Sequence, residues 1–311
     1  MKLLSIVVPC YNEGNCIVEF HEAIIRLGLS ISVEFVFVDD GSSDGTLGEI
    51  KRLAASADNV RYISFSRNFG KEAALLAGLE HSRGDVVVTM DADLQHKPEL
   101  LPEMLRLVDE EHYDCVATRR TDREGESPVR SWMAHRFYGL ISRYSEVSFP
   151  DGAMDFRMMT RQVVESVLKL RETNRFTKGI YQWVGFRTKW LETENAVRVE
   201  GESKWSMWGL FCYAMKGIVS FSTAPLQIAS VFGAFCCVPA FMYLMYILAK
   251  WAVFGERVSG WPTLICVILF IGGLQLLAGG ILGTYISFVY REVKRRPIYI
   301  VRESNCENGG C

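Results

Sequence analysis

The chain has 311 residues, a hydrophobic content of 49% and a formal net charge of −2 at pH 7. This length suffices for one globular domain of about 200 residues plus membrane segments. The slightly acidic balance argues against a general nucleic-acid binder, because such proteins carry a basic excess that neutralises phosphates. The 9 cysteines form no CxxC pair, which argues against a disulfide framework or a zinc site.

Short valine-rich runs that end at polar residues occur throughout the first half of the chain. They are Ile6 to Val8, Phe35 to Val38, Val86 to Met90 and, as a fourth, Val116–Ala117. Apolar residues at helical spacing over 14–28 and 71–82, and a helix start at Pro98, lie between these runs. The alternation predicts an α/β domain with a mainly parallel sheet, whose ligands bind at the carboxyl ends of the strands.

Two long apolar stretches follow this domain, at about 226–249 and about 262–288. Each is long enough to span a bilayer. More basic residues follow the second stretch than lie in the short connector, so the positive-inside rule predicts that both termini are cytoplasmic. A Gly279-x-x-x-Gly283 spacing could allow close helix packing and a homo-oligomer.

The domain boundaries follow from this pattern. We predict a cytoplasmic domain over 1–204, an interfacial amphipathic helix over 205–225, a two-helix anchor over 226–290 and a cytoplasmic tail over 291–311. The stretch 130–144 also mixes aromatic and basic residues, as both an interfacial helix and a core helix do. Residues 303–311 are polar and are expected to be a frayed tail.

The segment Asp91-Ala92-Asp93-Leu94-Gln95 follows one of the predicted strands. Its two carboxylates and one amide oxygen are hard ligands that suit Mg²⁺ or Mn²⁺ bridging a diphosphate. A pair of acids capping a turn is the alternative, because a DxD pattern often arises by chance. We predict Asp91, Asp93 and Gln95 as metal ligands, with Asp93 the principal one.

Several further motifs accompany this one in order. Pro9-x-Tyr11-Asn12-Glu13 follows the first strand, and Asp39-Asp40-Gly41-Ser42-x-Asp44-Gly45-Thr46 follows the second. Together they resemble the family 2 inverting glycosyltransferases of the GT-A fold. A second group resembles the bactoprenol glucosyltransferases, relatives of dolichyl-phosphate mannose synthase: Ser66-Arg67-Asn68-Phe69-Gly70-Lys71-Glu72, Asp155-Phe156-Arg157, Phe176-x-Lys178-Gly179 and Gly201-x-Ser203-Lys204-Trp205. The resemblance extends from Ile6 to Pro297.

The resemblance implies a donor site for a nucleotide sugar. Its residues would be Pro9, Tyr11, Glu13, Asp39, Asp40, Lys71, Asp91 and Ala92. Asp40 would accept a hydrogen bond from the ring N–H of the base, and Lys71 would steady the diphosphate. The alternatives are that Asp39 and Asp40 cap a turn and that Lys71 is a solvated lysine at a helix start.

The resemblance also implies an acceptor side, where Asp155 is a catalytic candidate as base or as positioner. A phosphate monoester has a second pKa near ~6 and is largely dianionic at neutral pH, so a strong base is not required. A local cap paired with Arg157 is the alternative for Asp155. Basic residues for the acceptor phosphate are Arg119, Arg120, Arg157, Lys178, Arg198 and Lys204, of which Arg119, Lys178 and Lys204 are favoured.

The implied function is transfer of a single hexose to undecaprenyl phosphate with inversion. The favoured donor is UDP-glucose, with Mg²⁺ or Mn²⁺ as cofactor, at the cytoplasmic face of the bacterial inner membrane, for cell-envelope glycans such as O-antigen. Mannose or a modified arabinose is the alternative sugar. A processive polysaccharide synthase should show a QxxRW motif and more spans. A non-catalytic flippase partner is disfavoured because Asp91, Asp93 and Gln95 are all present.

Overall fold

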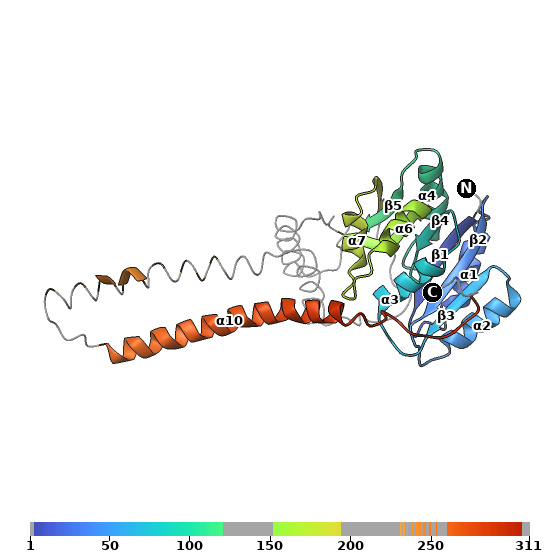
Figure 1. Ribbon diagram of the computed structural model, residues 1–311. Helices are drawn as coiled ribbons and strands as arrows, with labels where there is room; N and C mark the ends of the chain where they lie inside the picture. The colour runs from blue at the N-terminus through green and yellow to red at the C-terminus, as the bar shows by residue number, and fades with distance from the viewer. Residues whose placement is uncertain are drawn as a thin grey trace.

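The computed structural model describes residues 3–120, 152–193 and 260–306, together with scattered positions between 231 and 253. Figure 1 shows an α/β body from which one long helix, α10 (Trp261–Val293), projects. The chain returns from α10 to the body, so that both ends of the described chain lie on it.

The body is built on an 8-stranded sheet with the order β7-β5-β6-β4-β1-β2-β3-β8. Among the described strands, β6 and β8 run antiparallel to their neighbours, whereas the other pairings are parallel. This confirms the α/β class and the four predicted strands. The strands are β1 (Leu3–Cys10), β2 (Ser32–Asp39), β3 (Val60–Phe65), β4 (Val86–Thr89), β5 (Cys115–Arg120), β6 (Ala153–Thr160), β7 (Thr188–Thr193) and β8 (Val301–Ser304).

Helices cover both faces of the sheet, which makes the central strands apolar on both sides. The first face carries α1 (Ile17–Arg26), α2 (Thr46–Ser56), η1 (Pro98–Leu100) and α4 (Leu101–Asp109). The second face carries α3 (Lys71–His81), α6 (Arg161–Lys169) and α7 (Thr177–Trp183). In β1, Ile6 and Val8 pack on the first face and Val7 packs on the second. Burying one such side chain contributes about 1.5–3 kcal/mol.

Helix α3 lies unusually close to β1, which fixes the position of its first residue, Lys71. A Cβ at Gly78 would be 2.2 Å from the Val7 side chain, so this contact requires glycine. The predicted helices over 14–28 and 71–82 and the helix start at Pro98 are confirmed by α1, α3 and η1.

The end of the chain departs from the sequence-based expectation. Residues 303–306 are not frayed: β8 pairs with β3, and Cys306 is buried. The Tyr299 ring stacks on Phe65 with centroids 4.9 Å apart, and Lys51 Nζ lies 2.7 Å from Glu303 Oε2. The segment that follows α10 therefore covers the edge of the sheet at β3. The polar composition of this segment gave no indication of the pairing.

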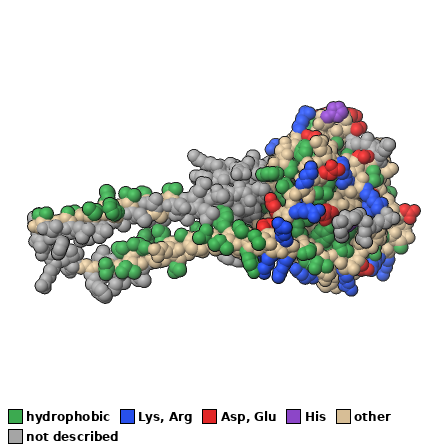
Figure 2. All heavy atoms as spheres, in the orientation of Figure 1, with side chains coloured by type: hydrophobic (Ala, Val, Ile, Leu, Met, Phe, Trp, Pro, Cys, Tyr) green, Lys and Arg blue, Asp and Glu red, His purple; other side chains and the backbone are tan. Residues whose placement is uncertain are grey.

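One helix in the described part of the chain qualifies as a candidate membrane span, Phe270–Val293. It belongs to α10, whose 33 residues correspond to about 50 Å at 1.5 Å per residue, more than the hydrocarbon core of about 30 Å. Figure 2 shows hydrophobic side chains along this helix and, on the face shown, charged side chains on the body. The predicted stretch 262–288 is thus a helix that extends further, to Val293.

The other predicted membrane elements cannot be placed in the same way. Most of the stretch 226–249 lies outside the described residues, and its described positions, such as Phe235 and Phe241, are helical and exposed. The predicted interfacial helix over 205–225 and the stretch 130–144 lie wholly outside the described residues.

Candidate active site

Strand register brings the polar motifs together at one edge of the sheet. The parallel strands β1, β2 and β4 end there at Cys10, Asp39 and Thr89. Strand β6 runs the opposite way and places Arg157 opposite Thr89, so Asp155 lies beyond the end of β4. The Thr89 hydroxyl donates to the Asp155 carbonyl at 2.6 Å. Asp91, two positions past Thr89, therefore lies near Asp155, and both carboxylates contact Lys71.

Four charged side chains form the centre of this edge, and we call them the lysine–aspartate cluster: Lys71, Asp91, Asp155 and Lys178. Lys71 Nζ lies 2.6 Å from Asp91 Oδ1 and 2.8 Å from Asp155 Oδ2. Lys178 Nζ lies 3.5 Å from Asp155 Oδ1 and donates to the Ala153 carbonyl at 3.0 Å. Lys71, predicted for the donor side, and Lys178, predicted for the acceptor side, thus both contact the carboxylate of Asp155.

The charges of the cluster stabilise one another. Burial acts to raise the pKa of Asp155, but Lys178 and Lys71 outweigh it and hold that pKa well below its ordinary value. Desolvation acts to lower the pKa of Lys71, but Asp155 and Asp91 outweigh it and raise that pKa. Asp155 is therefore a carboxylate and Lys71 an ammonium ion at neutral pH. A carboxylate held this way is a weak base and a good anchor for cations.

His96 also belongs to the site, although none of the motifs identified in the sequence contains it. Its ring is 4% exposed and stacks on Phe156 with centroids 5.2 Å apart. The Asp91 backbone N–H donates to His96 Nδ1 at 3.2 Å, and His96 Nε2 lies 4.0 Å from Asp91 Oδ2. Burial lowers the pKa of His96, so it is neutral at pH 7, with its proton on Nε2. The sequence feature that could have identified His96 is its position directly after Gln95.

The turn after β4 presents the predicted metal ligands. Leu94 has a φ of +54°, in the left-handed region, and the Gln95 N–H donates to Asp93 Oδ1 at 3.1 Å. A non-glycine residue held there is strained, as residues at functional turns often are. Asp91 forms an ion pair with Lys71, whereas Asp93 forms no ion pair within the described chain. Among the described residues, the Asp93 carboxylate is thus not engaged by the Lys71 ammonium.

The donor atoms of this turn fit a hard divalent cation only in part. Asp93 and Gln95 supply oxygen ligands, and the described residues hold no group of three His, Cys, Asp or Glu side chains that could bind a metal by themselves. Mg²⁺ and Mn²⁺ commonly take only one or two carboxylates and complete their shell with water and substrate phosphates. The turn is thus compatible with a cation that arrives with a diphosphate.

The two acids after β2 have structural partners. Asp39 accepts from the Ser42 N–H at 3.0 Å and from the Ser64 hydroxyl at 2.7 Å, contacts that match the turn-capping alternative. Asp40 accepts from the Phe69 N–H at 2.6 Å and the Gly70 N–H at 2.9 Å. Burial raises the pKa of Asp40, and these two bonds oppose that rise. Asp40 thereby fastens the loop that begins α3.

The loops after β1 and β2 are joined by hydrogen bonds. Asn12 has a φ of +55°, and its Oδ1 accepts from the Ser43 N–H at 2.9 Å. The Glu13 N–H donates to Thr46 Oγ1 at 2.9 Å. Pro9 is buried within β1, whereas the Tyr11 side chain is 42% exposed at this edge. Of the predicted donor-side residues on this loop, Tyr11 is the most exposed, and Glu13 is half-buried.

The predicted phosphate-binding residues do not all meet at the cluster. Arg119 forms an ion pair with Glu192 on the neighbouring strand β7. Arg157 is 2% exposed and lies inside the body, with its guanidinium over the Tyr181 and Trp190 rings at 4.6 and 5.2 Å. Lys178 alone of this set joins the cluster among the described side chains. Arg198 and Lys204 lie outside the described residues, as does the side chain of Arg120.

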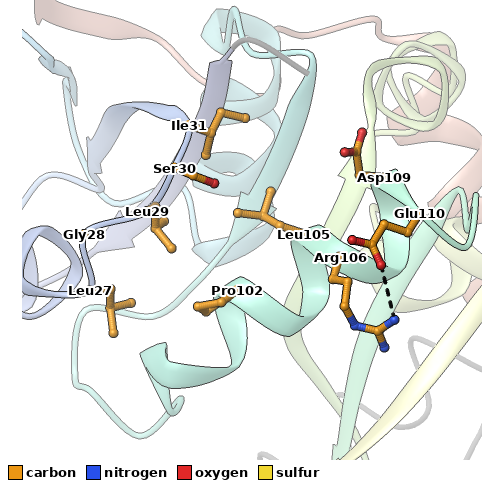
Figure 3. Close-up of a pocket in the computed structure, with 10 residues that line it drawn as sticks. All are labelled: Leu27, Gly28, Leu29, Ser30, Ile31, Pro102, Leu105, Arg106, Asp109 and Glu110. Carbon is orange, nitrogen blue, oxygen red and sulfur yellow. Dashed lines mark ion pairs between the residues drawn. The ribbon is translucent and has the colours of Figure 1, made fainter.

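Two cavities in the described chain lie away from the cluster. Figure 3 shows one of about 430 Å³ between the loop that precedes β2, 27–31, and helix α4. Because that loop leads into β2, this cavity lies at the opposite edge of the sheet from the cluster. The second, of about 350 Å³, lies beside the end of α10 and is lined by Glu172, Asn174, Tyr285, Phe288, Val289, Glu292 and Val293.

Comparisons with known proteins cover nearly the whole chain. The profile of the family Glycosyl transferase family 2 matches residues 5–168. The chain is 45% identical to CsbB of Bacillus subtilis (strain 168), over 98% of this chain and 93% of that protein. It is 41% identical to the SfII prophage-derived bactoprenol glucosyl transferase of Shigella flexneri, over 98% of this chain and 99% of that protein.

A third relative is the prophage bactoprenol glucosyl transferase homolog of Escherichia coli (strain K12), with 39% identity over 96% of this chain and 98% of that protein. A solved structure, the mannosyltransferase PcManGT from Pyrobaculum calidifontis in complex with GDP-Man and Mn²⁺, is similar with a TM-score of 0.48. It is 19% identical, and the similarity covers 93% of this chain and 84% of that one.

Proposed function

The chain belongs to glycosyl transferase family 2 and is a glycosyltransferase, and we propose that it transfers one glucose from UDP-glucose to undecaprenyl phosphate with inversion. The observation that carries the proposal is the lysine–aspartate cluster, which sets two cations at the edge where the donor and acceptor motifs meet. Relatives that share about 40% of their residues over the full length, named bactoprenol glucosyl transferases, support the acceptor and the sugar.

The cluster suits a reaction between two anions. A nucleotide diphosphate and a lipid phosphate repel each other, and Lys71 and Lys178 offset that repulsion from the two sides of Asp155. Asp155 keeps both ammonium groups in place. Because the lysines are held by a carboxylate, they need little reorganisation when phosphates arrive.

The reaction needs no proton transfer at the acceptor. A phosphate oxygen of the lipid forms a bond to the anomeric carbon while the bond from that carbon to the diphosphate oxygen breaks, and the electron pair leaves with the nucleoside diphosphate. The acceptor is already largely dianionic at neutral pH. The lowered pKa of Asp155 supports a positioning role, because a good general base has a pKa near the working pH.

Asp93, with Gln95 beside it, would hold Mg²⁺ or Mn²⁺. When bound, that cation supplies positive charge at the nucleotide diphosphate. Asp91 would remain with Lys71 and orient it between the donor and Asp155. The exposed Tyr11 ring would contact the nucleoside. Asp40 would accept a hydrogen bond from the base and would also position the loop before Lys71, to which it is bonded.

We place the protein in the bacterial inner membrane, with the body and both termini on the cytoplasmic side. The candidate span Phe270–Val293 and the lipid nature of the acceptor support this location. The basic residues at and just beyond the end of the span, Arg291, Lys294, Arg295 and Arg296, support the orientation.

The proposal is tested by incubating the full chain, reconstituted in liposomes, with undecaprenyl phosphate and a panel of nucleotide sugars, followed by mass spectrometry. We expect a hexosyl undecaprenyl phosphate from UDP-glucose. NMR of its anomeric proton should show the β configuration from the α-linked donor. Transfer from GDP-mannose alone would correct the sugar, and no lipid-linked sugar from any donor would overturn the function.

A further inference from the structure

The carboxylate of Glu292 attaches the last turn of α10 to the body. Glu292 accepts from the Thr173 N–H at 2.6 Å, from the Thr173 hydroxyl at 3.2 Å and from the Asn174 N–H at 3.3 Å. These three bonds join the end of the candidate membrane span to the loop between α6 and α7.

The same short segment is held at its other end by the active site. Glu72, which follows Lys71 on α3, accepts from both the Thr177 N–H, at 2.9 Å, and the Thr177 hydroxyl. The next residue, Lys178, is the lysine of the cluster that pairs with Asp155. Residues 173–178 therefore run from the carboxylate of the membrane helix to the acceptor-side cation of the active site.

We propose that Glu292 is a positioning residue that sets the height of Lys178 above the membrane surface, where the lipid phosphate of the acceptor lies. This inference rests on the proposed function. A bilayer fixes the depth of both α10 and the phosphate of a polyprenyl acceptor. The attachment of residues 173–178 to α10 therefore determines the distance between that phosphate and Lys178.

The donor side has contacts of its own that do not involve Glu292. Asp40 fastens the loop before Lys71, and the loops after β1 and β2 are bonded to each other. Lys178 itself keeps its bonds to Asp155 and to the Ala153 carbonyl. Loss of Glu292 should therefore weaken the use of a membrane-bound acceptor and leave donor binding unchanged.

Other contacts keep the segment after α10 on the body when Glu292 is changed. Strand β8 pairs with β3, Tyr299 donates to Glu80, and Lys51 pairs with Glu303. Glu303 supplies a matched control, because it too bonds the body through its carboxylate, but it lies beyond α10 and its partner, Lys51, is on α2.

The test compares the wild type with Glu292→Ala, Glu292→Gln and Glu303→Gln, each as the full chain in liposomes. Two acceptors are used: undecaprenyl phosphate, and a water-soluble polyprenyl phosphate of two isoprene units. For Glu292→Ala we expect KM for undecaprenyl phosphate to rise about tenfold, the loss of about one charge-assisted hydrogen bond. KM for UDP-glucose and KM for the short acceptor should change less than about twofold.

The conservative variant and the control sharpen the result. Glu292→Gln keeps one carbonyl oxygen for the N–H donors, so its KM for undecaprenyl phosphate should lie between those of the wild type and Glu292→Ala. Glu303→Gln should match the wild type. An unchanged KM for undecaprenyl phosphate, or an equal rise for both acceptors, overturns the positioning role. A wild type that uses neither acceptor would instead overturn the proposed function.

Discussion

Lys71 holds Asp91 and Asp155 with a single ammonium group, at 2.6 Å and 2.8 Å, although Asp91 follows β4 and Asp155 lies within β6. Without this cation the two carboxylates would repel each other across the site. Lys71→Met should therefore lower turnover by about 100-fold or more, as removal of a charged group at the reacting phosphates commonly does. Steady-state transfer measures the loss, and turnover within a few-fold of the wild type would remove Lys71 from the machinery.

Asp155 is expected to matter for transfer and not for donor binding. Asp155→Asn preserves the shape of the side chain but removes the charge that fixes Lys71 and Lys178. Turnover should fall by about 100-fold, while calorimetry shows UDP-glucose binding close to that of the wild type. If Asp155 were only a local cap paired with Arg157, as the alternative holds, the variant would transfer sugar at the normal rate.

Asp93 is expected to bind the cation. Asp93→Ala should abolish transfer, EDTA should silence the wild type, and added Mg²⁺ or Mn²⁺ should restore the wild type only. The matched variant Asp93→Glu keeps the carboxylate and should retain measurable activity at raised metal concentration. Full wild-type activity in EDTA would exclude the metal role.

His96 should make stability depend on pH in a defined direction. Its folded-state pKa lies below the unfolded value of about 6.5, so the unfolded chain binds more protons between these two values. The stability from neutral, buried His96 is present above about pH 6.5 and is lost as pH falls toward the folded pKa. His96→Asn should flatten the fall in unfolding temperature between about pH 7 and pH 5, measured in detergent. An unchanged slope would show that other groups cause it.

The orientation of the membrane segments can be tested by thiol labelling. Cys306 is buried against the body, so its silence would say nothing about its side of the membrane. An exposed position on β8 is suitable instead: Arg302→Cys should react with an impermeant reagent only after cells are permeabilised. Ser259→Cys, in the connector, should react in intact cells. The reverse pattern would place the termini outside.

The sequence alone determined the class of fold and the edge where the motifs gather. Valine-rich runs predicted β1, β2, β4 and β5 because strands buried on both faces are continuously apolar. Polar residues directly after those runs then had to lie at the carboxyl ends of the strands, which located Asp40 and Asp91. The length of the apolar stretch predicted α10, because a bilayer sets that length.

The tertiary structure alone decided which of these residues meet. Local periodicity does not state the partner of a strand, so the antiparallel insertion of β6 between β4 and β5 was not predicted, and this insertion brings Asp155 to Asp91. The same insertion buries Arg157 beneath Tyr181, because a central strand is covered on both faces. Likewise, Glu292 appears in the sequence as one more charge near the end of a long apolar stretch. Only the return of the chain to the body shows that its carboxylate bonds the loop leading to Lys178.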